Sequence, residues 1–356
     1  MAKAKNILGI CVSNRKNGNS SIILNELLRP AVGAGCRVEI LNLGALKILP
    51  CRGCLACARS CKCVLDDDLE LVKGKIEEAD AIALASPCYY LSAPSPLKAV
   101  MDRLASWAIG KRAGSTRRKY GVAVSVAGGA PIEFSLQRIY TSLFLGLFHC
   151  EITGQLTIGH SFGRGEILLA PSKLRSVSKL GENLLESVET GHCIKSPITE
   201  CEGRLTCPNC LSDAFQVCDD GRLVCPVCGV ELSCVNGNVT QKGVSRFSVE
   251  GALEHRSHII DNVIGGMLAG DEIGRRLKDY LESGVLPADD YEIDLNLAEV
   301  PGPPELAWDE NAAAVLKAAI PAPLEESVWK AISKRAFQNG IHRVTRETVL
   351  QYLPKF

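Results

Sequence analysis

Residues 6–21 read Asn-Ile-Leu-Gly-Ile-Cys-Val-Ser-Asn-Arg-Lys-Asn-Gly-Asn-Ser-Ser, a short apolar run that ends in a polar turn. A helical pattern follows from Ser20 to Ala34, so the stretch predicts the strand–turn–helix unit of a parallel sheet. Hydroxyl groups, a guanidinium and the N–H groups at a helix N-terminus are donors that bind a phosphate. The alternative is an ordinary serine-capped helix after a polar turn. The candidate phosphate-binding residues are Ser13, Arg15, Asn19, Ser20 and Ser21.

The same alternation of apolar runs and helical patterns continues to about residue 190. The predicted strands are Asn6–Val12, Arg37–Leu43, Ala81–Pro87, Tyr120–Val126 and Ile152–Ile158. The predicted helices are Ser20–Ala34, Asp68–Ala79, Pro96–Trp107, Ile132–Phe148 and Ser172–Val188. This order predicts an α/β fold, a flavodoxin-like doubly wound five-stranded parallel sheet. Ligands of such sheets bind at the carboxyl ends of the strands.

Two further loops are expected at that edge. The third strand runs into Ser86-Pro87-Cys88-Tyr89-Tyr90-Leu91-Ser92, whose amides and aromatic rings can face a flat ring. The alternative for this tyrosine pair is packing in the core or in a turn. Gly128 and Gly129 follow the fourth strand and close the same edge.

Cysteines are concentrated in the run Cys-Arg-Gly-Cys-Leu-Ala-Cys-Ala-Arg-Ser-Cys-Lys-Cys, which follows the second strand. Gaps of two residues bring thiolates together on a tight loop, as in a cubane iron–sulfur cluster. The candidate ligands are Cys51, Cys54, Cys57 and Cys63, with Cys61 between the last two. The alternative is a zinc clip, but zinc sites usually combine two separated cysteine pairs.

These motifs resemble the iron–sulfur flavoproteins of the NADPH-dependent FMN reductase family over about residues 5–190. The resemblance rests on Ser-x-Arg-x-x-Gly-Asn-Ser, the cysteine run, Asp66-Asp67-Asp68, Ser86-Pro87-x-Tyr89 and Leu97-Lys98-x-x-x-Asp102-Arg103. It implies FMN, with its phosphate held by residues 13–21 and its ring lined by Pro87, Cys88, Tyr89, Tyr90 and Leu91. It also implies a 4Fe–4S cluster on Cys51, Cys54, Cys57 and Cys63, because Cys61 takes the place of a small residue. The family implies homo-oligomers in which a cluster approaches the FMN of a neighbouring subunit.

A second metal site is predicted from two Cys-x-x-Cys knuckles, Cys207–Cys210 and Cys225–Cys228, around an Asp219-Asp220-Gly221 turn. Two such pairs close a tetrahedral zinc ribbon, whose expected role is structural because no coordination position stays open. A rubredoxin-like iron site is the second alternative. Zinc ribbons also bind nucleic acid, but the basic residues nearby are balanced by acidic ones, so this role is disfavoured.

Composition limits the function classes. The 356 residues include 40 basic and 40 acidic side chains, so the whole chain has no net field for nucleic acid or anionic lipid. The 17 cysteines and the absence of a cleavable leader favour metal-bound thiolates in a reducing cytoplasm. The most apolar helical run, Tyr140–Phe148, is far shorter than the ~20 residues of a membrane span.

The predicted organisation has five parts. These are the flavin and cluster domain (1–195), the zinc ribbon (199–240), amphipathic helices (245–285), a Pro-rich linker (286–303) and a small helical module (304–356). The last part resembles the carboxyl-terminal module of the B subunit of light-independent protochlorophyllide reductase. Its Ala322-Pro323-Leu324 departs from the usual aromatic pair and Arg, so docking or dimerisation is the favoured interpretation.

The predicted function is electron transfer between a two-electron and a one-electron partner. A ferredoxin or NAD(P)H is the expected donor, and the electron acceptor is unknown. No Gly-x-Gly-x-x-Gly follows a strand, so a dedicated nicotinamide domain is not expected. The alternatives are an NAD(P)H-dependent flavin or quinone reductase, and a redox-sensing regulator or assembly factor that uses the ribbon.

Overall fold

The computed structural model divides the chain into two compact units, Met1–Arg256 and Ser257–Phe356. The residues it describes are 4–112, 118–129, 135–196, 205–235, 238–251, 253–254, 275–276, 307–319, 328–329, 332–333, 336 and 343–352. Parts of the sequence prediction lie outside these residues: the start of the fourth helix (132–134), residues 199–204, most of 252–285, and all of the linker.

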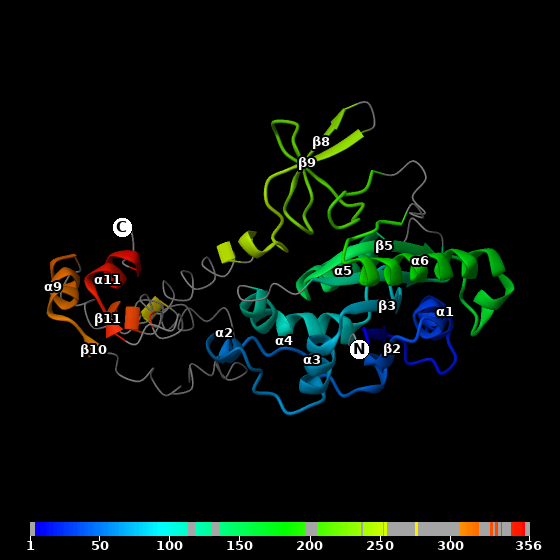
Figure 1. Ribbon diagram of the computed structural model, residues 1–356, viewed down its shortest axis with the longest axis horizontal. Coiled ribbons are helices and arrows are strands. Elements are labelled where there is room, and N and C mark those ends of the chain that lie inside the picture. Colours follow the sequence, from blue (N-terminus) through cyan, green and yellow to red (C-terminus); the bar gives the residue numbers. More distant parts are fainter. Residues whose placement is uncertain are drawn as a thin grey trace. The chain divides into compact units, whose positions relative to one another are not determined.

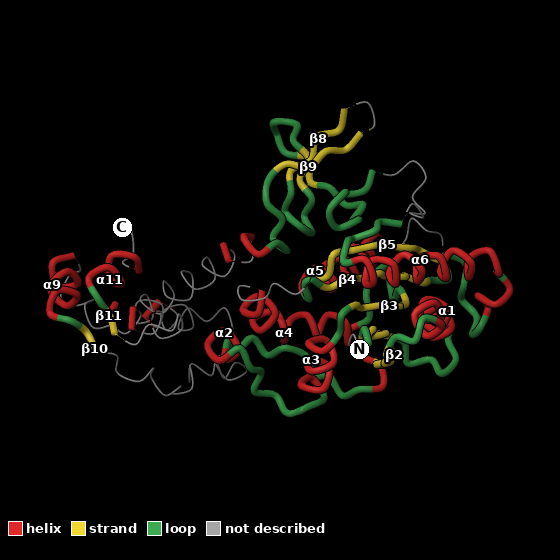
Figure 2. The backbone as a smooth tube through the Cα atoms, viewed as in Figure 1, coloured by secondary structure: helices red, strands yellow, loops and turns green. Residues whose placement is uncertain are grey.

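The first unit is built on a parallel sheet with strand order β2-β1-β3-β4-β5 (Figures 1 and 2). Its strands are β1 (Asn6–Cys11), β2 (Arg37–Asn42), β3 (Ala81–Pro87), β4 (Lys119–Val126) and β5 (Cys150–Ile158). Strands β3 and β4 are buried along their whole length, as expected for a sheet covered on both faces. The order 2-1-3-4-5 confirms the predicted flavodoxin-like fold.

Helices cover both faces of the sheet. One face packs against α1 (Asn19–Gly33) and α6 (Pro171–Thr190), and the other against α3 (Leu69–Glu78), α4 (Ser95–Arg112) and α5 (Ser135–Leu147). Gly181 of α6 lies so close to α1 that an added Cβ would sit 2.2 Å from the carbonyl oxygen of Leu27. The two helices therefore pack with their backbones nearly in contact.

The segment predicted to be a zinc ribbon belongs to the same unit. Four short antiparallel strands form it: β6 (Gln216–Val217), β7 (Leu223–Val224), β8 (Glu231–Val235) and β9 (Asn238–Lys242). The predicted hairpin turn lies between β6 and β7, where Gly221 has φ +80° and its N–H donates to the carbonyl of Cys218. The four knuckle cysteines lie in one buried apolar cluster with side chains of α4 and α5.

The second unit has its own small core. Its described elements are β10 (Ala307–Trp308), α9 (Glu310–Ala319), β11 (Arg343–Val344) and α11 (Arg346–Tyr352). Trp308 stacks on Trp329 with ring centroids 3.9 Å apart, and its indole N–H donates to Ser333 Oγ at 2.7 Å. Within the described parts of both units, no helix is long and apolar enough to cross a membrane.

Candidate cofactor and metal sites

The turn after β1 leads into the N-terminus of α1. The first N–H groups of a helix have no partner within the helix, and no side chain caps α1 at Gly18. The first turn carries no acidic residue, while Ser13 and Ser20 are buried against it. Such a set of amides and hydroxyls, with no acidic residue in the first turn of the helix, suits a phosphate group.

The loop after β5 holds two of the predicted phosphate residues in place. The side-chain amide of Asn19 donates to the carbonyls of Ser161 and Gly163, each at 2.8 Å, and its Oδ1 accepts from the N–H of Ile167 at 3.3 Å. Arg15 donates to the carbonyl of Phe162 at 3.0 Å. The Asn19 side chain thus joins the start of α1 to the loop after β5, whereas its backbone N–H lies in the first turn of α1.

Phe162 is a residue of this edge that the sequence reasoning missed. Its ring is 75% exposed, lies 5.9 Å from the guanidinium of Arg15, and packs so closely on Gly128 that a Cβ there would come within 2.7 Å of it. The signal was present in the run Gly159-His-Ser-Phe-Gly-Arg-Gly165, a polar glycine-rich loop at the carboxyl end of the fifth strand.

The loop after β3 forms a tight turn that displays its aromatic side chains. Cys88 donates its N–H to the carbonyl of Val126 at 2.7 Å, which ties this loop to β4. Tyr89 and Ser92 exchange backbone hydrogen bonds across the turn, and Tyr90 and Leu91 have φ of +47° and +66°. Tyr90 is 98% exposed, so packing in the core is wrong for this side chain. Exposed rings beside the carboxyl edge fit a flat ligand.

The cysteine loop leaves β2 at the expected edge but then runs along α4. The hydroxyl of Ser106 donates to Cys57 Sγ at 3.5 Å, and Gly110 lies beside Cys61. Ser106 is eleven residues from the start of α4, about 16 Å along the helix axis. The loop therefore does not stay above the carboxyl ends of the strands.

A buried ion pair between Arg103 and Asp67 anchors this path. The two side chains are 1% and 0% exposed, and Arg103 Nη2 lies 2.9 Å from Asp67 Oδ1 while Nη1 contacts Oδ2. Arg103 also donates to the carbonyls of Leu49 and Leu65, at 3.0 and 3.4 Å. Burial is the largest influence on the Asp67 carboxyl and acts to raise its pKa, but hydrogen bonds from Arg103 and two backbone amides hold that pKa below its ordinary value.

The surroundings of Cys61 and Cys63 differ in a way that bears on the choice of ligand. Cys63 Sγ accepts the Nε–H of Arg103 at 3.2 Å. Cys61 Sγ instead faces the carbonyl oxygen of Ser106 at 3.9 Å. Cys51 and Cys54 are exposed on the same loop. The loop thus offers a set of thiol donors of the kind that holds a four-cysteine iron–sulfur cluster.

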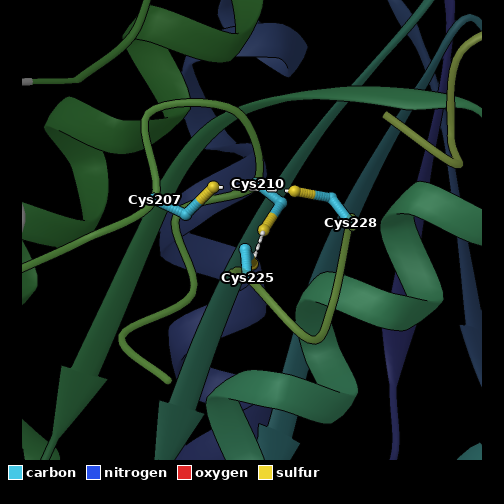
Figure 3. A group of neighbouring side chains, drawn as sticks. All are labelled: Cys207, Cys210, Cys225 and Cys228. Carbon is cyan, nitrogen blue, oxygen red and sulfur yellow. Dashed lines mark hydrogen bonds between the residues drawn. The ribbon is translucent and has the colours of Figure 1, made fainter. Parts of the chain in front are cut away.

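The ribbon cysteines Cys207, Cys210, Cys225 and Cys228 converge, with all four sulfurs within 4.8 Å of one another (Figure 3). The Cys207–Cys228 and Cys210–Cys225 sulfurs are each 3.6 Å apart. A tetrahedron with Zn–S bonds of ~2.3 Å has edges of about 3.8 Å, so the group is the right size for one zinc ion. The pKa of the Cys210 thiol is raised, first by its hydrogen bond with Cys207 and then by those with Cys225 and Cys228. A cation is needed to hold all four as thiolates.

A buried polar network fastens the first knuckle to the sheet. Arg138 of α5 donates to the carbonyl of Leu211 at 3.0 Å and to Thr157 Oγ1 of β5 at 3.2 Å. Its Nε lies 3.4 Å from Asp213 Oδ2, and the two side chains are 1% and 4% exposed. Ser142 donates to the carbonyl of Cys210 at 3.0 Å. The ribbon is thus part of the packing of α5 and β5.

We expect Arg138→Met to lower the free energy of unfolding by about 3–5 kcal/mol, because it removes one partner of a buried ion pair. Urea denaturation followed by circular dichroism measures this. The double variant Arg138→Met, Asp213→Leu should recover most of the loss, and Arg118→Met, which breaks an exposed pair with Glu151, should cost under about 1 kcal/mol. An equal loss in the single and double variants would contradict this account.

Comparison with known proteins supports the combination of a flavin edge and a cysteine loop. The family model described as NADPH-dependent FMN reductase matches residues 5–161. An iron–sulfur flavoprotein of Archaeoglobus fulgidus is 32% identical over 189 residues, which cover 51% of this chain and 80% of the relative. An iron–sulfur flavoprotein of Methanocaldococcus jannaschii is 34% identical over 138 residues, which cover 38% and 69%.

Among solved structures, a flavone reductase matches with a TM-score of 0.63 at 18% identity. The match covers 80% of this chain and 98% of that protein, so the likeness in fold extends beyond the sheet domain.

Proposed function

Because the chain belongs to the iron–sulfur flavoproteins of the NADPH-dependent FMN reductase family, we propose that it is an FMN- and 4Fe–4S-dependent oxidoreductase that passes electrons between a two-electron and a one-electron partner. Flavins exchange hydride or single electrons, and a cubane cluster exchanges one electron at a time. The observation that carries the proposal is the presence in one unit of a phosphate cradle, an exposed aromatic turn and a four-cysteine loop anchored by Arg103.

The carboxyl edge of the sheet holds the flavin in this proposal. Arg15, Ser13, Ser20, Ser21 and the N–H groups at the start of α1, including that of Asn19, bind the FMN phosphate. The segment Pro87, Cys88, Tyr89, Tyr90 and Leu91, together with Gly128 and Gly129, lines the ring. Phe162, in the loop after β5, extends the same edge next to Gly128. The matching family is described as NADPH-dependent, so NAD(P)H is the favoured electron donor and a ferredoxin the second.

The cluster is bound by Cys51, Cys54, Cys57 and Cys63, with Cys61 as a non-ligand. The course of the loop along α4 supports a homo-oligomer, because it separates these cysteines from the flavin edge of the same chain. A neighbouring copy that presents its own flavin edge to the loop would shorten the electron path.

The ribbon binds zinc in a structural role. Its four sulfurs are buried and leave no open coordination position, and its network with Arg138 ties it to the sheet. Metal-bound thiolates agree with a reducing compartment such as the cytoplasm.

Anaerobic purification followed by cofactor analysis tests this function. We expect one FMN, about four iron and one zinc per chain, with flavin absorption bands and a broad shoulder near ~400 nm. NAD(P)H or a reduced ferredoxin should then bleach both the flavin and the cluster bands. Absence of iron after anaerobic reconstitution would overturn the cluster, and salt-sensitive DNA binding would favour a regulator.

Arg15→Ala is expected to weaken FMN binding about 10- to 100-fold, the usual cost of a lost hydrogen bond to a charged group. Fluorescence quenching of FMN titrated with the apoprotein measures the Kd. Arg29→Ala is the matched control, because Arg29 pairs with Glu26 on the exposed side of α1. An unchanged Kd in Arg15→Ala would remove Arg15 from the phosphate site.

A further inference from the structure

Two side chains of α4 donate to the sulfurs of the cysteine loop. Arg103 Nε–H lies 3.2 Å from Cys63 Sγ, and Ser106 Oγ lies 3.5 Å from Cys57 Sγ. Residues three apart lie on the same face of a helix, so α4 presents both donors to the loop together. Among the described residues, no side chain donates to Cys51 or Cys54, and the Cys51 sulfur accepts only the backbone N–H of Gly53 at 3.4 Å.

We propose that Arg103 and Ser106 are positioning residues that set the reduction potential of the cluster through their hydrogen bonds to Cys63 and Cys57. The inference rests on the proposed function, in which these cysteines are cluster ligands. A donor to a ligand sulfur withdraws negative charge from it and so stabilises the reduced cluster. Both donors therefore raise the potential.

The contribution of Arg103 comes through its N–H group more than through its charge. Asp67 neutralises the guanidinium within the same buried pair. The five N–H donors of Arg103 have five acceptors: Cys63 Sγ, the carbonyls of Leu49 and Leu65, and the two oxygens of Asp67. A lysine carries the same charge but cannot reproduce this planar set of bonds.

Ser106 provides the cleaner test because its removal changes neither the net charge nor the Asp67 pair. An EPR-monitored redox titration of the holoprotein compares the wild type with Ser106→Ala and Ser106→Thr. We expect Ser106→Ala to lower the equilibrium constant for reduction of the cluster about three- to tenfold. A tenfold decrease corresponds to a reduction potential ~59 mV more negative for a one-electron couple. Ser106→Thr keeps the hydroxyl and should return the potential toward that of the wild type.

The control is Ser176→Ala on α6. It also removes a serine hydroxyl, one that donates to the backbone carbonyl of Ser172. Arg103→Lys should shift the potential further negative than Ser106→Ala, at equal iron content. An unchanged potential in a fully iron-loaded Ser106→Ala would overturn the inference. Failure of the proposed function is distinguishable, because the wild type itself would then show no reducible iron–sulfur signal.

Discussion

Cys63→Ser is expected to abolish the normal cluster, with iron falling from about four per chain to well below that after anaerobic reconstitution. A serine hydroxyl is a poor substitute for a thiolate as an iron ligand. Iron analysis and the EPR spectrum of the reduced protein measure the loss, and FMN content should stay at one per chain.

Cys61→Ser is the matched control, since it makes the same replacement of sulfur by oxygen at a position two residues earlier in the loop. Its sulfur faces the carbonyl of Ser106, and serine can make that contact with its hydroxyl. We expect full iron and an unchanged EPR spectrum. The reverse result, a normal cluster in Cys63→Ser and none in Cys61→Ser, would show that Cys61 is the fourth ligand.

Loss of the ribbon metal has the second large expected effect. Structural zinc contributes apparent binding energies of about 10–16 kcal/mol in small zinc-finger domains, comparable with the whole stability of an ordinary domain. Cys210→Ser should therefore eliminate zinc and unfold the ribbon. The loss of the ribbon would also leave Arg138 without its contacts to Leu211 and Asp213. We expect a large drop in Tm for the sheet domain as well.

Zinc content by mass spectrometry and thermal unfolding by circular dichroism measure both effects. Cys218→Ser is the control, because Cys218 lies at the β6–β7 turn and is not one of the four converging sulfurs. Stoichiometric zinc and a wild-type Tm in Cys210→Ser would refute a structural role for this site.

The sheet was predictable because apolar runs, such as those of β1 and β3, are bounded by polar turns. The bounds of β3 agree at both ends, and β1 differs from its prediction only at Val12. The pairing of Cys207–Cys210 with Cys225–Cys228 was equally predictable, since two short knuckles on either side of a turn can bring their four sulfurs together in few ways. Local periodicity and spacing carry that information.

The path of the cysteine loop could not be predicted from the sequence in the same way. It depends on Arg103 meeting Asp67 across 36 residues of sequence, and no periodic pattern reports such a pair. The Asn19 contacts with the loop after β5 span more than 140 residues and are hidden for the same reason. Helix α2 (Ala56–Ser60) was also missed, because five residues between left-handed Leu55 and Cys61 are too short for a helical period.

The position of Arg138 also sets the order in which the unit can be completed during synthesis. Leu211 follows Arg138 by 73 residues. At about 5–20 residues per second, α5 emerges from a ribosome roughly 4–15 seconds before the knuckle that covers it. During that interval the guanidinium and the surrounding apolar face of α5 are open to water and to other chains. The 73 residues between Arg138 and Leu211 therefore set a minimum time for which this face stays uncovered during synthesis.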